Sequence, residues 1–116
     1  MGQQPDVNHR FMYEGMLINP LLYSVIMFKS VYKDSYIIKA LLEGGADINY
    51  AEQNTGLTAL MMCSYLESEE NACHLMTILC ETVASPNLNQ TDFGINTALH
   101  HAAWKNKQTL CKYLIS

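Results

Sequence analysis

The sequence predicts an all-α fold in which antiparallel helix pairs stack into a solenoid and are joined by short hairpin-like turns. The leading observation is an internal repeat, because Thr97-Ala98-Leu99 copies the upstream segment Thr58-Ala59-Leu60. A weaker copy, Asn19-Pro20-Leu21, lies the same interval further back. A fixed period of about 40 residues is typical of repeat proteins, in which each unit is one supersecondary element stacked on the last. Apolar residues at helical spacing follow each copy, which indicates helices rather than strands.

The first unit is expected to contain two helices. Pro20 suits the first turn of a helix, and apolar residues recur at helical spacing through about Phe28. A second helix is expected to begin at Asp34 or Ser35 and to end at Gly44-Gly45, where a glycine can adopt the left-handed conformation. The predicted buried face of this helix consists of Ile37, Ile38, Leu41 and Leu42.

The second unit repeats this order. Residues 58–65 predict a short helix. A longer helix is expected to begin at Ser68 and to end near Val83, and Glu69 and Glu70 in its first turn favour the helix dipole. The apolar face of this longer helix is predicted to contain Leu75, Ile78 and Leu79.

The third unit is also expected to contain two helices. Residues 97–105 predict a short helix, residues 108–115 predict a second one, and Asn106 is expected to form a left-handed turn between them. Residues 1–13 show little periodicity, so we expect a frayed or loosely packed N-terminal arm there. Part of this arm is expected to pack on the first repeat through Phe11, Met12 and Tyr13. The repeat domain is then predicted at residues 14–116, divided at about 14–49, 50–89 and 90–116.

Three segments resemble ankyrin repeats: residues 41–49 (LLEGGADIN), 56–60 (GLTAL) and 97–103 (TALHHAA). The resemblance covers roughly residues 14–116 and implies an ankyrin-type solenoid. The third unit fits the family pattern without a gap. The first two units are longer than the family norm of ~33 residues, and the extra residues fall between their paired helices, at 28–34 and 66–71.

The sequence departs from the family pattern at cap and turn positions. The His of the family's Thr-x-Leu-His motif is present only as His100, since the matching positions hold Met61 and Leu22. Gly94 falls one place early for the turn glycine and leaves Ile95 at that position. These changes are expected to lower local stability without disturbing the apolar pattern, so the predicted fold is unchanged.

The resemblance implies a non-catalytic module that binds a partner protein or peptide on the concave face and finger tips. The exposed position of the short inner helices holds Ile26, Tyr65 and Trp104, one in each repeat and equally spaced. We expect these three to form an apolar and aromatic row, because aromatic anchors are favoured at the centres of interfaces. The other expected partner contacts are Leu66 and Lys105 on the inner helices and Tyr50, Glu52, Gln53, Asn54, Leu57, Phe93 and Asn96 on the fingers.

Two alternatives remain open at this stage. Tyr65 and Trp104 could instead pack beneath the loops between the helices, as a satellite of the core. The chain could also be a structural fragment of a longer repeat array, or it could self-associate through apolar terminal helices. A terminal repeat normally presents a polar outer face, whereas the last predicted helix carries Leu110, Cys111, Leu114 and Ile115.

Composition and charge narrow the class of partner. The chain of 116 residues is 49% hydrophobic and 16% charged, which is typical of a globular protein. A net charge of −4 with only seven Lys and Arg argues against a nucleic-acid partner. No apolar run approaches the ~18 residues of a membrane span, and no secretory signal is visible. We therefore expect no membrane insertion and a cytoplasmic protein, with the nucleus as the alternative compartment.

The reactive side chains predict neither a catalytic site nor a metal site. Cys73 and His74 with Cys80 lack the paired short intervals of structural zinc sites, and the cysteines are expected to be buried reduced thiols. His100 and His101 near Asp92 suggest a general base, but no Ser or Cys nucleophile accompanies them. His101 is expected to pack against the next element. We therefore predict no catalytic residue, no metal ligand and no cofactor.

Overall fold

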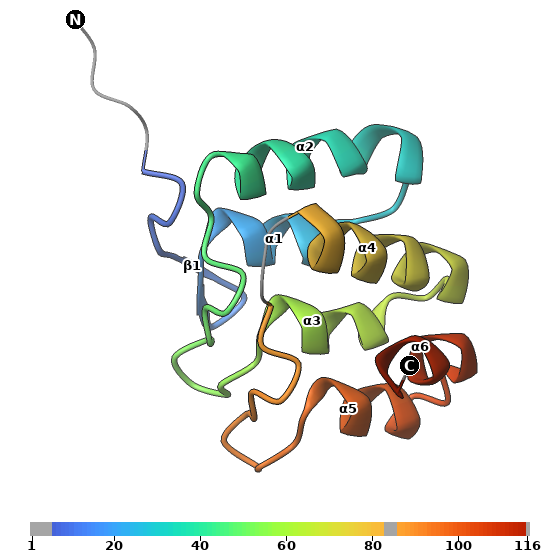
Figure 1. Ribbon diagram of the computed structural model, residues 1–116. Helices are drawn as coiled ribbons and strands as arrows, with labels where there is room; N and C mark the ends of the chain where they lie inside the picture. Colours follow the sequence, from blue (N-terminus) through green and yellow to red (C-terminus); the bar gives the residue numbers. More distant parts are fainter. Residues whose placement is uncertain (1–5, 83–85, 116) are drawn as a thin grey trace, which may run out of the picture.

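The computed structural model describes residues 6–82 and 86–115, whose helices form two stacked layers (Figure 1). The inner layer contains three short helices, α1 (Pro20–Ile26), α3 (Ala59–Met62) and α5 (Ala98–Trp104). The outer layer contains α2 (Val31–Glu43), α4 (Glu69–Thr82) and α6 (Gln108–Ile115). Consecutive helices within each layer are in contact, and α2 and α6 lie at opposite ends of the outer layer. The chain is therefore a helix-turn-helix solenoid, as the internal repeat predicted.

Each inner helix begins at one of the repeated positions found in the sequence. Asn19, Thr58 and Thr97 precede α1, α3 and α5, and each side chain accepts a hydrogen bond from the backbone N–H three residues on. Such caps satisfy donors that a helix N-terminus otherwise leaves without a partner. In α5 the imidazole of His100 also accepts a hydrogen bond from the Thr97 N–H, at 3.1 Å, and completes a capping box. The predicted starts of these helices are confirmed.

The outer helix α2 begins earlier than predicted. Its N-terminal cap position is Ser30, whereas Asp34 or Ser35 was expected. Asp34 instead lies in the first turn, where its carboxylate accepts hydrogen bonds from the N–H groups of Lys29 at 2.7 Å and Ser30 at 2.9 Å. These two bonds are the main reason why the pKa of Asp34 lies below its usual value. The prediction was wrong because the Asp34 side chain reaches back to the cap instead of forming it.

The apolar faces of the outer helices agree in part with the prediction. Ile38 and Leu42 are buried in α2, but Ile37 is 53% exposed. The prediction for Ile37 was wrong because α2 lies at the end of the stack, where one of its sides has no helix of the described chain against it. In α4, Leu75 and Leu79 are fully buried. The expected helix end at Val83 falls outside the described residues.

The N-terminal segment forms a finger where a frayed or loosely packed arm was expected. Strand β1 (Phe11–Tyr13) pairs antiparallel with β2 (Met16–Ile18). Phe11 and Tyr13 pack edge to face on Tyr23 of α1, with ring centroids 5.8 and 5.2 Å away, whereas Met12 is exposed. Strands of three residues are too short for an alternating pattern to be recognised in the sequence.

Three equivalent turns at the base of the fingers repeat along the stack. Asp6, Asp47 and Asn87 each accept, on a side-chain oxygen, a hydrogen bond from the backbone N–H two residues on, at 2.9, 2.9 and 3.1 Å. Neighbouring turns are then joined by asparagines. The Asp47 N–H donates to Asn8 Oδ1 at 2.7 Å, and the Asn87 N–H donates to Asn49 Oδ1 at 2.9 Å. We call Asn8, Asn49 and the equivalent residue of the third turn, Asn89, the asparagine series.

Residues with positive φ occupy the turns, where the sequence predicted them at three positions. Gly45 ends α2 with φ +98°, and Asn106 lies between α5 and α6 with φ +57°. Gly56 has φ +77° in the second finger, and Ile95, its equivalent in the third, has φ +63°. The prediction that Ile95 replaces a turn glycine is therefore confirmed. A β-branched residue is strained in this conformation.

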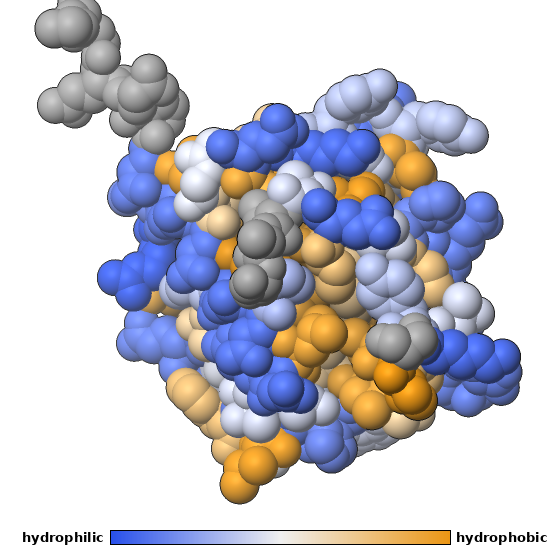
Figure 2. Space-filling view, viewed as in Figure 1, coloured by the Kyte–Doolittle hydropathy of each residue, from blue (hydrophilic) through white to orange (hydrophobic). Residues whose placement is uncertain are grey.

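The main hydrophobic core lies between the two layers. Its largest fully buried apolar side chains come from the first finger and from helices of both layers: Ile18, Leu21, Leu22, Val25, Ile38, Leu60, Met61, Leu75, Met76, Leu79 and Leu110. The exposed surface is not uniformly polar, because Figure 2 shows apolar surface gathered over α6. The α6 end of the stack therefore differs from the polar outer face expected of a terminal repeat.

Candidate functional site

An apolar hollow opens beside the inner helices. It has a volume of about 260 Å³ and is lined by Met16, Val25, Ile26, Leu57, Met62, Tyr65 and Leu66. We call these seven residues the apolar groove. They come from β2, α1, the second finger, and α3 with the turn that follows it. Four of them were predicted as partner contacts from the sequence: Ile26, Leu57, Tyr65 and Leu66.

A second hollow adjoins the apolar groove, since both are lined by Ile26, Tyr65 and Leu66. It has a volume of about 560 Å³ and extends toward the loops between paired helices, where its further lining residues are Phe28, Lys29, Glu67, Ser68 and Asn71. The loop of the first repeat is held against the second repeat, because the Asn71 side chain donates to the Lys29 carbonyl at 3.1 Å. The extra residues of the first two repeats therefore form one wall of this hollow.

Tyr65 is the residue around which the apolar groove is organised. It ends the short 3₁₀ helix η1 (Cys63–Tyr65), which continues α3, and it is 47% exposed. The Tyr65 hydroxyl lies 2.6 Å from His101 Nδ1, and the Lys105 ammonium lies 5.3 Å from the Tyr65 ring centroid. A cation near an aromatic face is attracted to the ring. The ring thus faces the groove while its hydroxyl is fixed in place.

His101 is buried between Tyr65 and Asp92. Its Nε2 atom lies 2.8 Å from Asp92 Oδ2, and its Nδ1 atom lies 2.6 Å from the Tyr65 hydroxyl. A neutral imidazole has one donor and one acceptor nitrogen. A carboxylate only accepts, so Nε2–H donates to Asp92, and in the neutral imidazole Nδ1 is then the acceptor for the Tyr65 hydroxyl. Tyr23 and Met62 occupy the equivalent position in the first two repeats, so the third repeat places a polar group where the others are less polar.

The protonation of these groups argues against a catalytic relay. Burial and the Asp92 charge together raise the pKa of Tyr65. Burial also acts to raise the pKa of Asp92, but hydrogen bonds from the Asn96 N–H and from His101 outweigh it and lower that pKa. The phenol is therefore neutral and the carboxylate ionised at neutral pH. A phenol that acts as a nucleophile or base needs a lowered pKa, so this geometry favours a structural role.

Trp104 lies outside the apolar groove. It is 75% exposed at the end of α5, so it does not pack beneath a loop and that alternative is wrong for this residue. Tyr65 fits both the binding and the packing interpretation. Its ring lines the groove, where a partner could contact it, and its hydroxyl is bonded within the protein. Lys105 is exposed beside Tyr65.

Two predicted finger contacts are used inside the protein instead. The Tyr50 hydroxyl donates to the Leu17 carbonyl at 2.7 Å. Glu52 is fully buried, and its carboxylate accepts hydrogen bonds from the N–H groups of Leu17, Asn54 and Thr55 at 2.9, 3.1 and 3.0 Å. The prediction that Glu52 contacts a partner was wrong, because its carboxylate holds the second finger against β2.

The remaining finger residues differ in exposure. Gln53 and Phe93 are exposed, with Phe93 at 68%. The exposed Asn54 side chain donates to the Gly15 carbonyl at 3.1 Å and links the first two fingers. Asn96 is half-buried, and its N–H donates to Asp92 Oδ1 at 2.9 Å. Of the predicted finger contacts, Gln53 and Phe93 are therefore the ones most available to a partner.

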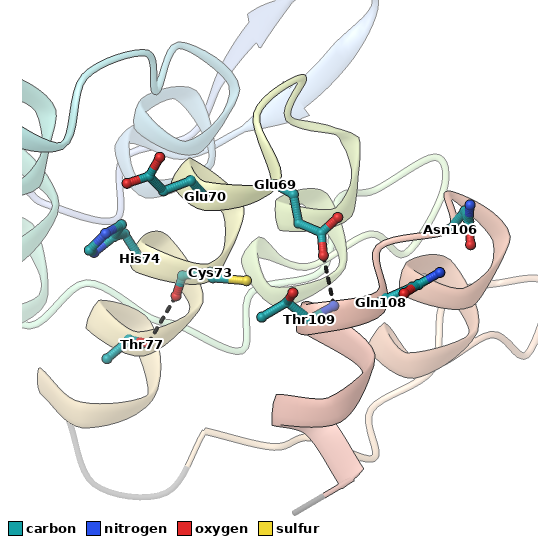
Figure 3. A pocket seen from close by; sticks show the side chains of 8 residues that line it. All are labelled: Glu69, Glu70, Cys73, His74, Thr77, Asn106, Gln108 and Thr109. Atoms are coloured by element: carbon teal, nitrogen blue, oxygen red, sulfur yellow. Dashed lines mark hydrogen bonds between the residues drawn. The ribbon is translucent and has the colours of Figure 1, made fainter.

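A further hollow of about 730 Å³ lies between α4 and the start of α6 (Figure 3). The Glu69 carboxylate accepts a hydrogen bond from the Thr109 N–H at 2.7 Å, and the side chains of Cys73 and His74 point to different sides of α4. Among the residues that the structure describes, no three His, Cys, Asp or Glu side chains come together to hold a metal ion. All four cysteines are free thiols; Cys63 is fully buried, and burial raises its pKa.

Comparison with protein families explains the repeated architecture. A model of ankyrin repeats, in three copies, matches residues 22–116. The chain belongs to the ankyrin repeat family. Ankyrin repeats are generally protein–protein interaction modules, and they are typically non-catalytic. A search of curated proteins gave no match to the chain. No helix in the described part of the chain is long and apolar enough to span a membrane.

The ankyrin repeat architecture also explains which site residues were missed. Met16, Val25 and Met62 line the apolar groove but were not predicted, because they belong to the finger or to buried helix positions. The role of His101 was missed as well. Its equivalence to Met62 of the second repeat was a usable signal, because a polar residue at a core position needs buried partners.

Proposed function

We propose that this ankyrin repeat domain binds a segment of a partner protein by inserting an apolar side chain into the apolar groove. The observation that supports this proposal is the convergence of seven residues from separate elements on one hollow lined mostly by apolar atoms. Concave apolar sites of this kind are typical binding sites in proteins. A pocket of about 260 Å³ has room for one large side chain of a partner.

The fixed position of Tyr65 favours binding at this groove. Ordering a side chain at an interface costs about 0.5–1.5 kcal/mol for a flexible residue. The Tyr65 hydroxyl is already bonded to His101, and Lys105 lies near its ring. A partner that packs on Tyr65 therefore meets a ring whose orientation is set in the free protein.

Exposed residues beyond the groove would extend the contact. Trp104 occupies the position of Tyr65 in the third repeat, and it is exposed beside Lys105. Gln53 and Phe93 are exposed on the second and third fingers. A partner centred on the groove would reach Trp104 along the inner helices and Phe93 along the fingers. Tyr65 and Trp104 are then the aromatic anchors of the proposed interface.

The experiment is a selection of binders from a random peptide display library. We expect the selected peptides to share an apolar anchor and to lose at least about tenfold in affinity for the Ile26→Lys and Leu66→Lys variants, since a charge would then lie in an apolar pocket. Both side chains are only partly buried, and thermal unfolding of each variant checks that it remains folded.

Tyr32→Lys is the matched control, because Tyr32 is an exposed apolar side chain on α2, outside the groove. This variant should bind the selected peptides as the parent does. Peptides that bind the parent, the groove variants and the control equally would contradict the proposal. Failure to select any peptide would contradict it as well.

A further inference from the structure

Each outer helix carries two pairs of adjacent apolar residues, and the second pair begins four residues after the first, as in Ile37-Ile38 and Leu41-Leu42 of α2. The first residue of the pattern is Ile37 in α2, Leu75 in α4 and Leu110 in α6. Leu75 and Leu110 are fully buried, whereas Ile37 is 53% exposed. Only α2 has no outer helix before it in the described chain. This first position is therefore the one that a preceding outer helix covers.

The last residue of the same pattern shows the opposite trend. It is Leu42 in α2, Cys80 in α4 and Ile115 in α6. Leu42 is buried and Cys80 is half-buried, whereas Ile115 is 72% exposed. Within the described residues no outer helix follows α6. The last position is therefore the one that a following outer helix covers, and α6 presents an isoleucine there.

The asparagine series has an acceptor without a partner at one end and a donor without a partner at the other. Asn8 and Asn49 each accept a hydrogen bond from the backbone N–H of the next turn, at 2.7 and 2.9 Å. The equivalent residue of the third turn is Asn89, whose side chain has no partner among the described residues. The equivalent donor is the Asp6 N–H, which is likewise without a partner there.

The surface at the α6 end is also hollowed. A cavity of about 410 Å³ is lined by Ala103, Asn106, Gln108, Cys111 and Lys112. A comparable hollow lies between α4 and α6, where Asn106, Gln108 and Thr109 form the wall on the side of the third repeat. Figure 2 shows apolar surface over α6 at this end of the stack. Asn106 and Gln108 line both hollows.

We propose that copies of this chain stack end to end, with α6 and the third turn of one copy against α2 and the first turn of the next. Ile115 then packs against the α2 surface around Ile37, and Asn89 Oδ1 accepts a hydrogen bond from the Asp6 N–H of the second copy. The occupant is a second copy because this contact continues the α2–α4 and α4–α6 contacts within the chain. The surface is different from the apolar groove, so the two proposals stand independently.

The symmetry of this contact sets the expected assembly. It joins two different surfaces, so it is heterologous and each added copy leaves an open end. Sedimentation velocity of the parent chain should therefore reveal a concentration-dependent series of dimers and longer species over about a hundredfold range of concentration, as mass action requires. A parent chain that stays monomeric over this range overturns the proposal.

Two lysine variants distinguish end-to-end stacking from other modes of association. Ile37→Lys blocks the α2 end, and Ile115→Lys blocks the α6 end. Each variant alone should be monomeric, because every contact needs both ends. An equimolar mixture should form a 1:1 dimer and nothing longer, since one intact α6 end meets one intact α2 end. Self-association of either variant alone, or a mixture that stays monomeric, overturns the proposal.

Two further variants serve as controls. Ile26→Lys makes the same change in the apolar groove and should leave assembly intact, so its result separates this proposal from peptide binding. Asn89→Ala should weaken assembly about fivefold, as expected for one hydrogen bond, without changing the thermal unfolding of the monomer. Equal assembly by Asn89→Ala and the parent would show that the asparagine series does not continue between copies. Ile37 and Ile115 are both exposed, so their lysine variants are expected to fold.

Discussion

The hydroxyl of Tyr65 and the imidazole of His101 are joined across two repeats by a contact of 2.6 Å. Tyr65 ends η1 of the second repeat, whereas His101 lies within α5 of the third. The imidazole also contacts Asp92 of the third finger at 2.8 Å. One buried side chain therefore connects the finger and inner helix of one repeat with the inner helix of another.

Replacing His101 is expected to destabilise the domain strongly. His101→Ala removes the partner of two polar groups and leaves a cavity, so the free energy of unfolding should fall by about 3 kcal/mol. Tyr65→Phe removes one hydrogen bond and should cost about 1 kcal/mol. Urea unfolding of both single variants and the double variant gives the coupling energy between the two residues. A coupling near zero would contradict the proposed role of the bond.

Replacing Ile95 by glycine is expected to stabilise the domain. Ile95 has φ +63° and is 78% exposed, so glycine would relieve backbone strain and remove few contacts. The free energy of unfolding should rise by about 1 kcal/mol, measured by urea unfolding. Gly56→Ala is the reverse experiment, because Gly56 has φ +77° and a Cβ there would lie 2.8 Å from the Phe93 ring. The predicted sign is wrong if Ile95→Gly is less stable than the parent.

The stability of the domain is expected to depend on the ionisation of Glu52. Burial acts to raise the pKa of Glu52, but hydrogen bonds from Leu17, Asn54 and Thr55 outweigh it, so the pKa lies below the usual 4.5. The ionised carboxylate therefore favours the folded state above the pKa of the unfolded chain. This contribution is lost as the pH falls through the lower pKa of the folded state.

The Glu52→Gln variant tests this pH dependence. Near pH 7 the variant should be less stable by about 2 kcal/mol, because a neutral amide replaces a charged acceptor of several N–H groups. The difference from the parent should narrow as the pH falls below the usual pKa of Glu52 and through the lower pKa of the folded state, where the parent side chain in the folded protein also becomes neutral. Urea midpoints measured across acidic and neutral pH provide the readout. A difference that is constant with pH would exclude ionisation as the cause.

The asparagine series predicts a graded set of alanine variants. Asn8→Ala and Asn49→Ala each remove an acceptor of a backbone N–H from the neighbouring turn, so each should lower the free energy of unfolding by about 1 kcal/mol. Asn89→Ala removes no such bond within one copy and should leave the monomer unchanged. Chemical unfolding at low protein concentration gives the comparison. Equal losses for all three variants would contradict the series.

The fold was predictable because its signals are periodic. The caps Asn19, Thr58 and Thr97 recur at one fixed interval, and each begins an inner helix in the structure. Boundaries set by a single side chain were not predictable in this way. Asp34 resembles a helix cap in the sequence, yet its carboxylate bonds back to Lys29 and Ser30. Periodicity gives the number and order of helices, whereas one hydrogen bond decides where a helix begins.

The candidate site was predictable only where it follows the repeat. Ile26 and Tyr65 share a repeated position, and the structure brings both into the apolar groove. Glu52 has the charge and loop position typical of a surface residue, but it is buried by contacts with β2 that no sequence pattern reveals. His101 shows the same limit, since its partners Tyr65 and Asp92 lie 36 and 9 residues away.

The contacts between neighbouring fingers bear on how the domain unfolds. Glu52 holds the second finger to the Leu17 N–H of the first at 2.9 Å, and the Phe93 N–H of the third finger donates to the Thr55 carbonyl of the second at 3.0 Å. A repeat that opened alone would leave its neighbour with unpaired backbone groups. Local opening of one repeat therefore carries the added cost of unpairing groups on its neighbour, and the array should lose its structure cooperatively instead of fraying repeat by repeat.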